Sequence, residues 1–216
     1  EERMFKHIYV PVDNSDYSNH AIDLAILLGR AFGSKLTGCH VYAARLHDYR
    51  FKQMEYTLPE EYKDETELER QRKIHDSLIA MGLQLISDSY LDVMGQKAEA
   101  AGLVFERKMM DGKHYKVLIQ DVKESDYDLV IIGALGMGAV RDSQLGSVTE
   151  RFVRKVTTDT LVVKNTDQIE ASGEAIVVCL DGSPESFNGL KLGGALGKAL
   201  DRPVEAVAVY DPYLHY

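Results

Sequence analysis

Short apolar runs alternate with helix-like segments along residues 6–164, and this alternation restricts the chain to one class of fold. Five runs read as strands: Lys6–Val12, Lys35–Tyr42, Leu103–Met109, Asp128–Gly133 and Thr160–Lys164. Strands that alternate with helices form right-handed βαβ units. We therefore expect an α/β fold built on a doubly wound parallel sheet, with the fully apolar run Asp128–Gly133 near its centre.

The segments between these runs are predicted mainly from helical periodicity. A helix is expected after the turn-forming Asp13-Asn14-Ser15 and is stopped by Gly33. The residues from Ala43 to Pro59 show no clean period, so a loop or lid is expected there. Further helices are predicted over Glu60–Ala101 (with a break near Gly82 or Gly95), Tyr115–Ser125 and Ser147–Val156.

The sequence restarts after residue 173, which indicates a duplicated domain. At an offset of 168 residues, Asp13 matches Asp181 and Ser15 matches Ser183. We expect a first domain over residues 1–164, a linker over 165–173, and the opening β-α-β part of a second copy over 174–216. That part lacks the later strands and cannot close its own sheet. Either the natural chain continues past Tyr216, which we favour, or the fragment pairs with something else.

The net charge argues against two classes of partner, and the cysteines indicate buried thiols rather than a metal site. The formal net charge is -9 and the pI is about 5.3, which argues against nucleic acid and against an anionic membrane surface. No apolar run is long enough to span a membrane, and the N-terminus lacks the apolar segment of a signal peptide. Cys39 and Cys179 lie in apolar runs without metal-ligand spacing, so both are expected to be buried thiols in a cytoplasmic protein.

A glycine-rich loop follows the most apolar strand and opens a helix. It runs from Gly133 to Ser147 and includes Gly136, Gly138 and Gly146. Glycines let backbone N–H groups approach a polyphosphate closely, and successive N–H groups form a nest for anions. Ser147 can cap the following helix or donate to a phosphate oxygen. Open α/β sheets bind ligands at this edge, where the strands end.

Two common phosphate-binding motifs are excluded by the spacing of the loop. It lacks the GK[ST] of a Walker A loop, and it does not follow the first strand as a dinucleotide fingerprint does. The alternative without a ligand is that the loop is merely a tight turn from strand to helix.

The loop does match the G-x2-G-x9-G-[ST] pattern of ATP-binding universal stress proteins at Gly133, Gly136, Gly146 and Ser147. The chain resembles that family from about Met4 to Lys164. The resemblance implies a Rossmann-like sheet with strand order 3-2-1-4-5 and pairing of domains through the last strand, either in a homodimer or between two domains of one chain.

The resemblance also implies the residues that hold the nucleotide. Asp13 would lie near the ribose and phosphates, acting through Mg²⁺ or through hydrogen bonds, and Val12 and Val41 would lie against the adenine. The full set of implied ATP-binding residues is Pro11, Val12, Asp13, Val41, Ile132, Gly133, Gly136, Met137, Gly138, Gly146, Ser147, Val148 and Thr149.

These inferences favour an ATP-binding regulatory or signalling module in a stress response, with ATP and Mg²⁺ as ligands. No Ser-His-Asp or Cys-His set can be assigned, so an efficient ATPase is not expected. Two alternatives remain open: slow ATP hydrolysis or autophosphorylation at the same site, and a nucleotide-free scaffold for protein interaction. For the scaffold, the candidate surface is a tyrosine cluster in the insertion, whose other explanation is packing on its own domain. His47 and His215 repeat between the copies without an assigned role.

Overall fold

The computed structural model describes residues 4–138, 143–166 and 174–209. The chain divides into two compact units, residues 1–166 and 167–216. The elements of the first unit are β1 (His7–Pro11), α1 (Asp16–Phe32), β2 (Lys35–Tyr42), α2 (Ala44–Glu55), a 3-10 turn η1 (Glu60–Tyr62), α3 (Glu65–Ala100), β3 (Phe105–Asp111), α4 (His114–Glu124), β4 (Leu129–Gly133), α5 (Ser147–Val153) and β5 (Asp159–Val163).

These five strands form one parallel sheet with the order β3-β2-β1-β4-β5. The α/β class and the strand order 3-2-1-4-5 are therefore confirmed. The order reverses between β1 and β4, since β1 leads to β2 on one side and β4 leads to β5 on the other. Such a switch point leaves a crevice at the carboxyl ends of the strands.

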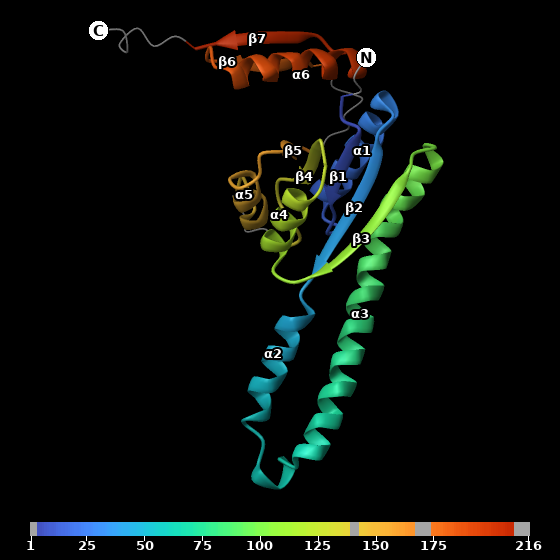
Figure 1. Cartoon of the computed structure of the whole chain (residues 1–216), viewed down its shortest axis with the longest axis vertical. Coiled ribbons are helices and arrows are strands. Elements are labelled where there is room, and N and C mark those ends of the chain that lie inside the picture. Colours follow the sequence, from blue (N-terminus) through green and yellow to red (C-terminus); the bar gives the residue numbers. More distant parts are fainter. Residues whose placement is uncertain (1–3, 139–142, 167–173, 210–216) are drawn as a thin grey trace, which may run out of the picture. The chain divides into compact units, whose positions relative to one another are not determined.

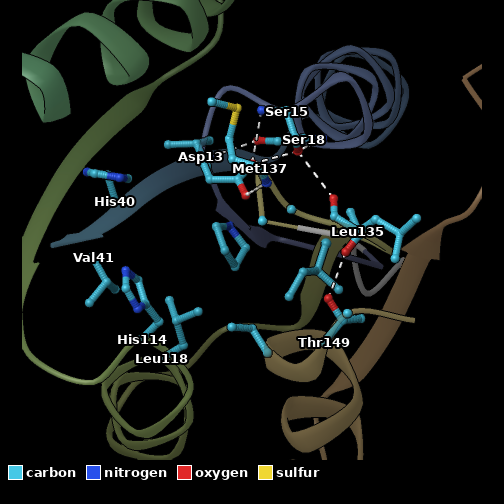
Figure 2. A pocket seen from close by; sticks show the side chains of 18 of the residues that line it. Asp13, Ser15, Ser18, His40, Val41, His114, Leu118, Leu135, Met137 and Thr149 are labelled. Carbon is cyan, nitrogen blue, oxygen red and sulfur yellow. Dashed lines mark hydrogen bonds between the residues drawn. The ribbon is translucent and has the colours of Figure 1, made fainter. Parts of the chain in front are cut away.

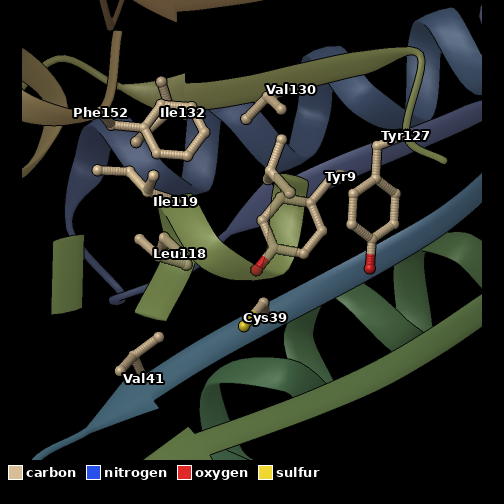
Figure 3. Close-up of a cluster of buried hydrophobic side chains, with 10 residues drawn as sticks. Tyr9, Cys39, Val41, Leu118, Ile119, Tyr127, Val130, Ile132 and Phe152 are labelled. Atoms are coloured by element: carbon tan, nitrogen blue, oxygen red, sulfur yellow. The ribbon is translucent and has the colours of Figure 1, made fainter. Parts of the chain in front are cut away.

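Helices cover both faces of the sheet, with α1 and α3 on one face and α4 and α5 on the other (Figure 1). A buried cluster fills the space beneath α4 and α5 (Figure 3). It contains Tyr9, Cys39, Val41, Leu118, Ile119, Val122, Tyr127, Val130, Ile132 and Phe152. Cys39 is a free, buried thiol, as predicted. Because Val41 and Ile132 end their strands, this core reaches up to the crevice.

The expected loop after β2 is wrong, because residues 44–55 form helix α2. Its stability comes from contacts with α3 rather than from an apolar period of its own. Glu55 accepts hydrogen bonds from Arg72, and the ring of Phe51 stacks on His75 with centroids 4.0 Å apart. Figure 1 shows α2 and the first half of α3 as a hairpin that extends beyond the sheet.

The expected break in the next helix is also wrong, because α3 is continuous over its 36 residues. Neither Gly82 nor Gly95 adopts a positive φ. A Cβ on Gly95 would lie 3.2 Å from the ring of Phe105, so this glycine lets the helix pack against β3. The helix ends where Gly102 takes a left-handed φ of 69°. None of the described helices is long and apolar enough to cross a membrane.

The predicted tyrosine cluster comprises Tyr42, Tyr49, Tyr56 and Tyr62; Tyr42 is half-buried, and the other three point largely into solvent. The exposed fractions are 60% for Tyr49, 83% for Tyr56 and 65% for Tyr62. This exposure disfavours the alternative in which they pack on their own domain, and a partner surface stays a prediction. His47 is exposed as well, whereas His215 lies outside the described residues.

The second unit contains β6 (Ile176–Leu180), α6 (Pro184–Leu200) and β7 (Val204–Ala208), with β6 and β7 paired in parallel. Its first turn repeats that of the first unit. Ser183 N donates to Asp181 Oδ1 at 2.9 Å, as Ser15 N donates to Asp13 Oδ1 at 3.1 Å. The described elements match the expected opening β-α-β, while the extent of a duplicated domain stays a prediction.

The expectation that Cys179 is buried is wrong, because its side chain is exposed. Neighbouring residues of β6 point to opposite faces of the sheet. Val178 faces α6 and is buried, with its methyl groups close to Gly193. Cys179 lies on the other face, which no described element of this unit covers.

Candidate functional site

A pocket of about 450 Å³ opens at the carboxyl ends of β1, β2 and β4, at the switch point of the sheet (Figure 2). Every residue predicted from the family pattern lines this pocket: Pro11, Val12, Asp13, Val41, Ile132, Gly133, Gly136, Met137, Gly138, Gly146, Ser147, Val148 and Thr149. The fold thus brings three separate chain segments to one place. The part of the predicted loop from 139 to 142 lies outside the described residues.

The carboxylate of Asp13 is held in a fixed position just after β1. Its Oδ1 accepts hydrogen bonds from Ser15 N at 3.1 Å and from Ser15 Oγ at 2.6 Å. Ser15 also caps α1, because its side chain accepts a hydrogen bond from Ser18 N. Asn14 provides the turn with a positive φ of 61°. The start of α1 and the orientation of Asp13 are therefore fixed by the same few residues.

Asp13 also contacts the backbone of the glycine-rich loop. Its Oδ2 accepts a hydrogen bond from Met137 N at 3.2 Å. A Cβ built on Gly136 would lie only 2.5 Å from that same oxygen. Gly136 therefore has to be a glycine for the loop to pass this close to the carboxylate. No such contact surrounds Gly138, where an added Cβ would meet nothing within 4 Å.

The strand-to-helix connection is closed by a second set of contacts. The hydroxyl of Thr149, which is 4% exposed, donates to the carbonyl oxygen of Gly133 at 2.8 Å. Gly146 N donates to Ala134 O at 2.7 Å. A Cβ on Gly133 would lie 2.9 Å from Tyr17 Cβ, so this glycine lets α1 pack against the end of β4.

Ser147 does not cap α5, which corrects one of its two predicted roles. Ser147 is the first residue of the helix, and Gly146 holds the N-cap position without a side-chain hydrogen bond. A glycine cannot supply a capping oxygen, so no side chain caps the first turn of this short helix. The predicted donation from Ser147 to a ligand stays a prediction.

One side of the pocket is apolar. Val12, Val41 and Ile132 are each 4% exposed and end three adjacent strands. Leu118 of α4 adds to this wall, and Figure 2 shows it beside Val41 and His114. The opposite side consists mainly of glycine-loop backbone and the Asp13 turn. An apolar wall facing a backbone-rich wall suits a ligand with a flat apolar ring and a polar tail.

A further wall of the pocket comes from α3, which the sequence pattern did not reveal. Ile86 and Tyr90 line the pocket beside His40. The His40 ring lies edge-on to Tyr90 with centroids 5.1 Å apart, and its Nδ1 is 2.8 Å from Ser87 Oγ. The remaining residues that the prediction missed are Ser15, Ser18, Cys39, His114, Leu118 and Leu135. Only Ser15 and Ser18 had a sequence signal, which was their recurrence in the second copy.

His40 is neutral at physiological pH. Burial lowers the pKa of its imidazole, and the nearby His114 lowers it further, against an opposing effect of Asp13. A neutral ring in contact with Tyr90 and Ser87 presents a hydrogen-bonding edge without adding positive charge to the pocket. The imidazole therefore contributes shape and polarity there rather than a charge.

The described part of the chain contains no cluster of three or more His, Cys, Asp or Glu residues that could hold a metal ion. Among the described residues, Asp13 is the only carboxylate that lines the pocket. A divalent ion at this site would therefore need most of its oxygen ligands from a bound phosphate group and from water.

An open parallel α/β sheet with a ligand pocket at its switch point defines the class of this protein. The model of the universal stress protein family matches residues 4–164, and the chain belongs to that family. It is 24% identical over 161 residues to the universal stress protein YxiE of Bacillus subtilis, covering 74% of this chain and 100% of that protein. It is 26% identical over 163 residues to MJ0531 of Methanocaldococcus jannaschii, covering 76% and 84%.

Solved structures share the fold. A universal stress protein from Archaeoglobus fulgidus matches with a TM-score of 0.67 and 15% identity, covering 96% of this chain and 68% of that chain. The hypothetical protein MJ0577 matches with a TM-score of 0.57 and 20% identity, covering 76% and 99%. The first of these alignments extends beyond the first unit, because 96% of the 216 residues is more than the 166 residues of that unit.

Proposed function

We propose that the pocket binds an adenine nucleotide, ATP together with Mg²⁺, and that its occupancy acts as a regulatory signal in a stress response. The observation that carries the proposal is the approach of the glycine loop to Asp13. Gly136 and Met137 N are fitted around one carboxylate oxygen on the side of the pocket opposite its apolar wall. A strand-to-helix turn has no need of that fit, whereas a ribose-phosphate ligand uses both the carboxylate and the loop backbone.

The two sides of the pocket match the two ends of a nucleotide. Val12, Val41 and Leu118 offer an apolar slot for the base, and the free backbone edge at the end of β2 can recognise its polar rim. The loop at Gly136–Gly138 and the uncapped first turn at Gly146–Ser147 offer N–H groups to the phosphates. The volume of about 450 Å³ lies within the range of roughly 300–1,000 Å³ that is typical of small-molecule sites.

The Asp13 carboxylate fits a role beside Mg²⁺ but not as a complete metal site. Oδ1 already accepts two hydrogen bonds and Oδ2 accepts one, so a free lone pair remains on Oδ2. Mg²⁺ often binds through one or two carboxylates together with substrate phosphates and water. Mg²⁺ would offset the repulsion between Asp13 and a triphosphate, while Asp13 would orient the ion or accept from a ribose hydroxyl.

The hydrogen bonds favour binding over turnover. A general base needs a free lone pair within reach of the attacking water. Asp13 keeps one lone pair on Oδ2, which the proposed Mg²⁺ would take, and His40 lies against Ser87. No other carboxylate and no arginine or lysine lines the described pocket. We therefore propose regulation, rather than slow hydrolysis or autophosphorylation, as the main role of this site.

A scaffold function has one specific observation in its favour, which is the exposure of large apolar side chains on α3. This surface does not compete with the pocket, because it lies on another part of the helix. A nucleotide-regulated module and a protein-binding module can therefore coexist in this chain.

Isothermal titration calorimetry with ATP and Mg²⁺ tests the proposal on the wild-type chain and on a Gly136→Val/Gly146→Val double variant. The added side chains would collide with Asp13 Oδ2 and approach Ala134 O. We expect saturable binding by the wild type and none by the double variant. Chelation of Mg²⁺ should weaken ATP binding more than AMP binding, because AMP carries less charge.

Two further results decide between the alternatives. Gly82→Val serves as the matched control and should retain binding, since Gly82 lies in α3 outside the pocket and an added Cβ there meets nothing within 4 Å. Phosphate release that exceeds that of an Asp13→Ala variant would favour the enzyme. No ATP binding by folded wild-type protein would refute the nucleotide proposal. The nucleotide-free scaffold for protein interaction would then be the remaining hypothesis.

A further inference from the structure

A stripe of large apolar side chains lies exposed on α3, beyond the part that packs on the sheet. It consists of Ile74, Leu78, Met81 and Leu85, whose side chains are 50%, 64%, 66% and 72% exposed. Their spacing of four, three and four residues is the a/d spacing of a coiled coil. We call these four residues the α3 stripe.

The stripe faces away from α2 and from the buried residues of α3 that pack on the sheet; further along the same face, Asp88 and Asp92 pair with Arg107 of β3. The helix meets α2 on the side of Arg72 and His75, through the pairs Arg72–Glu55 and His75–Phe51. It meets the sheet on the side of Leu91 and Met94, both fully buried. At about 100° per residue, the centre of the stripe lies about 120° around the helix from the midpoint of Arg72 and His75, and about 140° from the midpoint of Leu91 and Met94. No described element of the first unit covers it.

The stripe is also free of charge. Residues 77–87 contain no Asp, Glu, Lys or Arg. The nearest charges already have neighbours within the chain: Lys73 pairs with Glu69 at 3.0 Å, Asp76 lies 3.4 Å from His75 Nδ1, and Asp88 and Asp92 pair with Arg107. In a chain with a formal net charge of -9, an uncharged apolar stripe on a protruding helix is a surface on which two copies can meet without opposing like charges in the stripe itself.

We propose that the α3 stripe pairs with the α3 stripe of a second copy of this chain, in antiparallel orientation. The spacing reads the same from both ends, so the stripe is complementary to itself when one copy is reversed. In this register Leu78 lies opposite Met81 of the second copy, and Ile74 lies opposite Leu85. A two-fold interface of this kind uses the same patch on both subunits.

The antiparallel orientation follows from the position of the sheet on α3. Only the C-terminal half of the helix packs on β2 and β3, so the reversed arrangement keeps the two acidic globular parts at opposite ends. Two parallel copies would instead bring both net charges of -9 side by side. This surface lies on α3 and is separate from the last strand, β5, through which the family resemblance implies pairing.

The length of the stripe predicts a weak dimer. Four apolar positions make two heptads, whereas sustained coiled coils use about three to four. Interfaces smaller than the standard size are typical of transient association. We expect a dimer whose population rises with concentration across the micromolar range. The proposal does not depend on nucleotide binding, so failure of either proposal leaves the other standing.

Sedimentation velocity of the full chain over about 1–200 µM tests the association. The wild type should shift from the monomer mass of 24.2 kDa toward twice that mass. Leu78→Glu places a carboxylate in the centre of the interface and should raise the dissociation constant at least tenfold. Ala80→Glu adds the same charge to an exposed position of the same helix outside the stripe, and it should leave the association unchanged.

A wild type that stays monomeric throughout would overturn the proposal. Sedimentation with neutral phosphatidylcholine vesicles would then show whether a lipid surface or a different protein occupies the stripe. Equal loss of association in Leu78→Glu and Ala80→Glu would also overturn it. Circular dichroism should show the same helix content in all three proteins, because both substituted positions are exposed.

Disulfide trapping tests the orientation. Cys39 and Cys179 are replaced by serine, and Leu78→Cys and Met81→Cys variants are then oxidised separately and as a mixture. The antiparallel register predicts that the mixed disulfide forms faster than either disulfide between identical variants. Faster trapping of Leu78→Cys with itself would indicate parallel pairing and would overturn the proposed arrangement.

Discussion

Asp13 Oδ2 and Gly136 lie so close that a methyl group on the glycine would sit 2.5 Å from the carboxylate oxygen. This contact joins the end of β1 to the loop that follows β4, which are far apart in the sequence. It makes the shape of the pocket sensitive to a single added carbon atom.

Gly136→Ala should therefore weaken binding of ATP by at least tenfold, equivalent to about 1.4 kcal/mol. The methyl group forces the loop away from Asp13 and breaks the 3.2 Å hydrogen bond from Met137 N. Calorimetry measures the change in affinity. Gly82→Ala adds the same methyl group in α3, outside the pocket, where it meets nothing within 4 Å, so it should bind like the wild type. Equal affinities for the two variants would contradict the role of this contact.

Thr149→Val should lower the free energy of unfolding by about 1–3 kcal/mol, because the carbonyl of Gly133 loses its buried hydroxyl partner. Valine keeps the shape of threonine, so the change reports mainly on the hydrogen bond. Thr149→Ser retains the hydroxyl and should recover part of the stability. Urea unfolding of the three proteins makes the comparison, and similar losses for both variants would point to packing instead.

Lys108→Met should destabilise the fold by about 3 kcal/mol, since it leaves the carboxylate of Asp121, which is 5% exposed, without its cation. Burial alone would lower the pKa of Lys108, but contacts with Asp121 and Tyr127 raise it to about 12. The lysine is therefore charged at neutral pH. Its stabilising effect is present below pH 10.5 and is lost as the pH rises through about 12.

The double variant Lys108→Met/Asp121→Leu provides the control for that prediction. It removes both charges and should be more stable than Lys108→Met alone. Guanidinium unfolding of the wild type and the two variants completes the test. A double variant that loses as much stability as the sum of both single changes would show that the pair is not coupled.

Acidification below about pH 6.5 should destabilise the fold through its partly buried histidines. Burial lowers the pKa of both His7 and His40 in the folded state. The unfolded chain then binds more protons, so the free energy of unfolding falls as the pH falls from 6.5. His40→Asn should reduce this slope and leave the share that His7 contributes. Urea unfolding between about pH 7 and pH 5 measures the slope. Equal slopes in the wild type and in His40→Asn would contradict the role of His40.

The sheet and most of the pocket could be predicted from the sequence because they rest on local signals. Apolar runs such as Leu129–Gly133 have few alternatives to a buried strand, and the turn at Asp13–Ser15 marks the start of a helix. The family pattern then supplied the strand order and the glycine positions. Because the fold gathers the carboxyl ends of the strands, residues from separate segments meet without any sequence signal of contact.

The α2–α3 hairpin was not predictable in the same way, because tertiary contacts stabilise it. Helix α2 has no clean apolar period and depends on Arg72 and His75 of its neighbour. The positions of Ile86 and Tyr90 in the pocket wall depend on the path of α3 past β2. Similarly, Cys179 and Cys39 both lie in apolar runs of the sequence. They differ in whether other elements cover the face of the sheet on which they lie, so Cys39 is buried and Cys179 is exposed.

The continuity of α3 has a mechanical consequence. At 1.5 Å per residue its 36 residues make a rod about 54 Å long. Ile86 and Tyr90 touch the pocket, and Leu78 to Leu85 lie directly before them on the same rod. An unbroken helix has no hinge to absorb a tilt, so whatever displaces Ile86 also displaces the far tip by a larger distance. A ligand that displaced Ile86 would thereby produce a larger movement at the far tip.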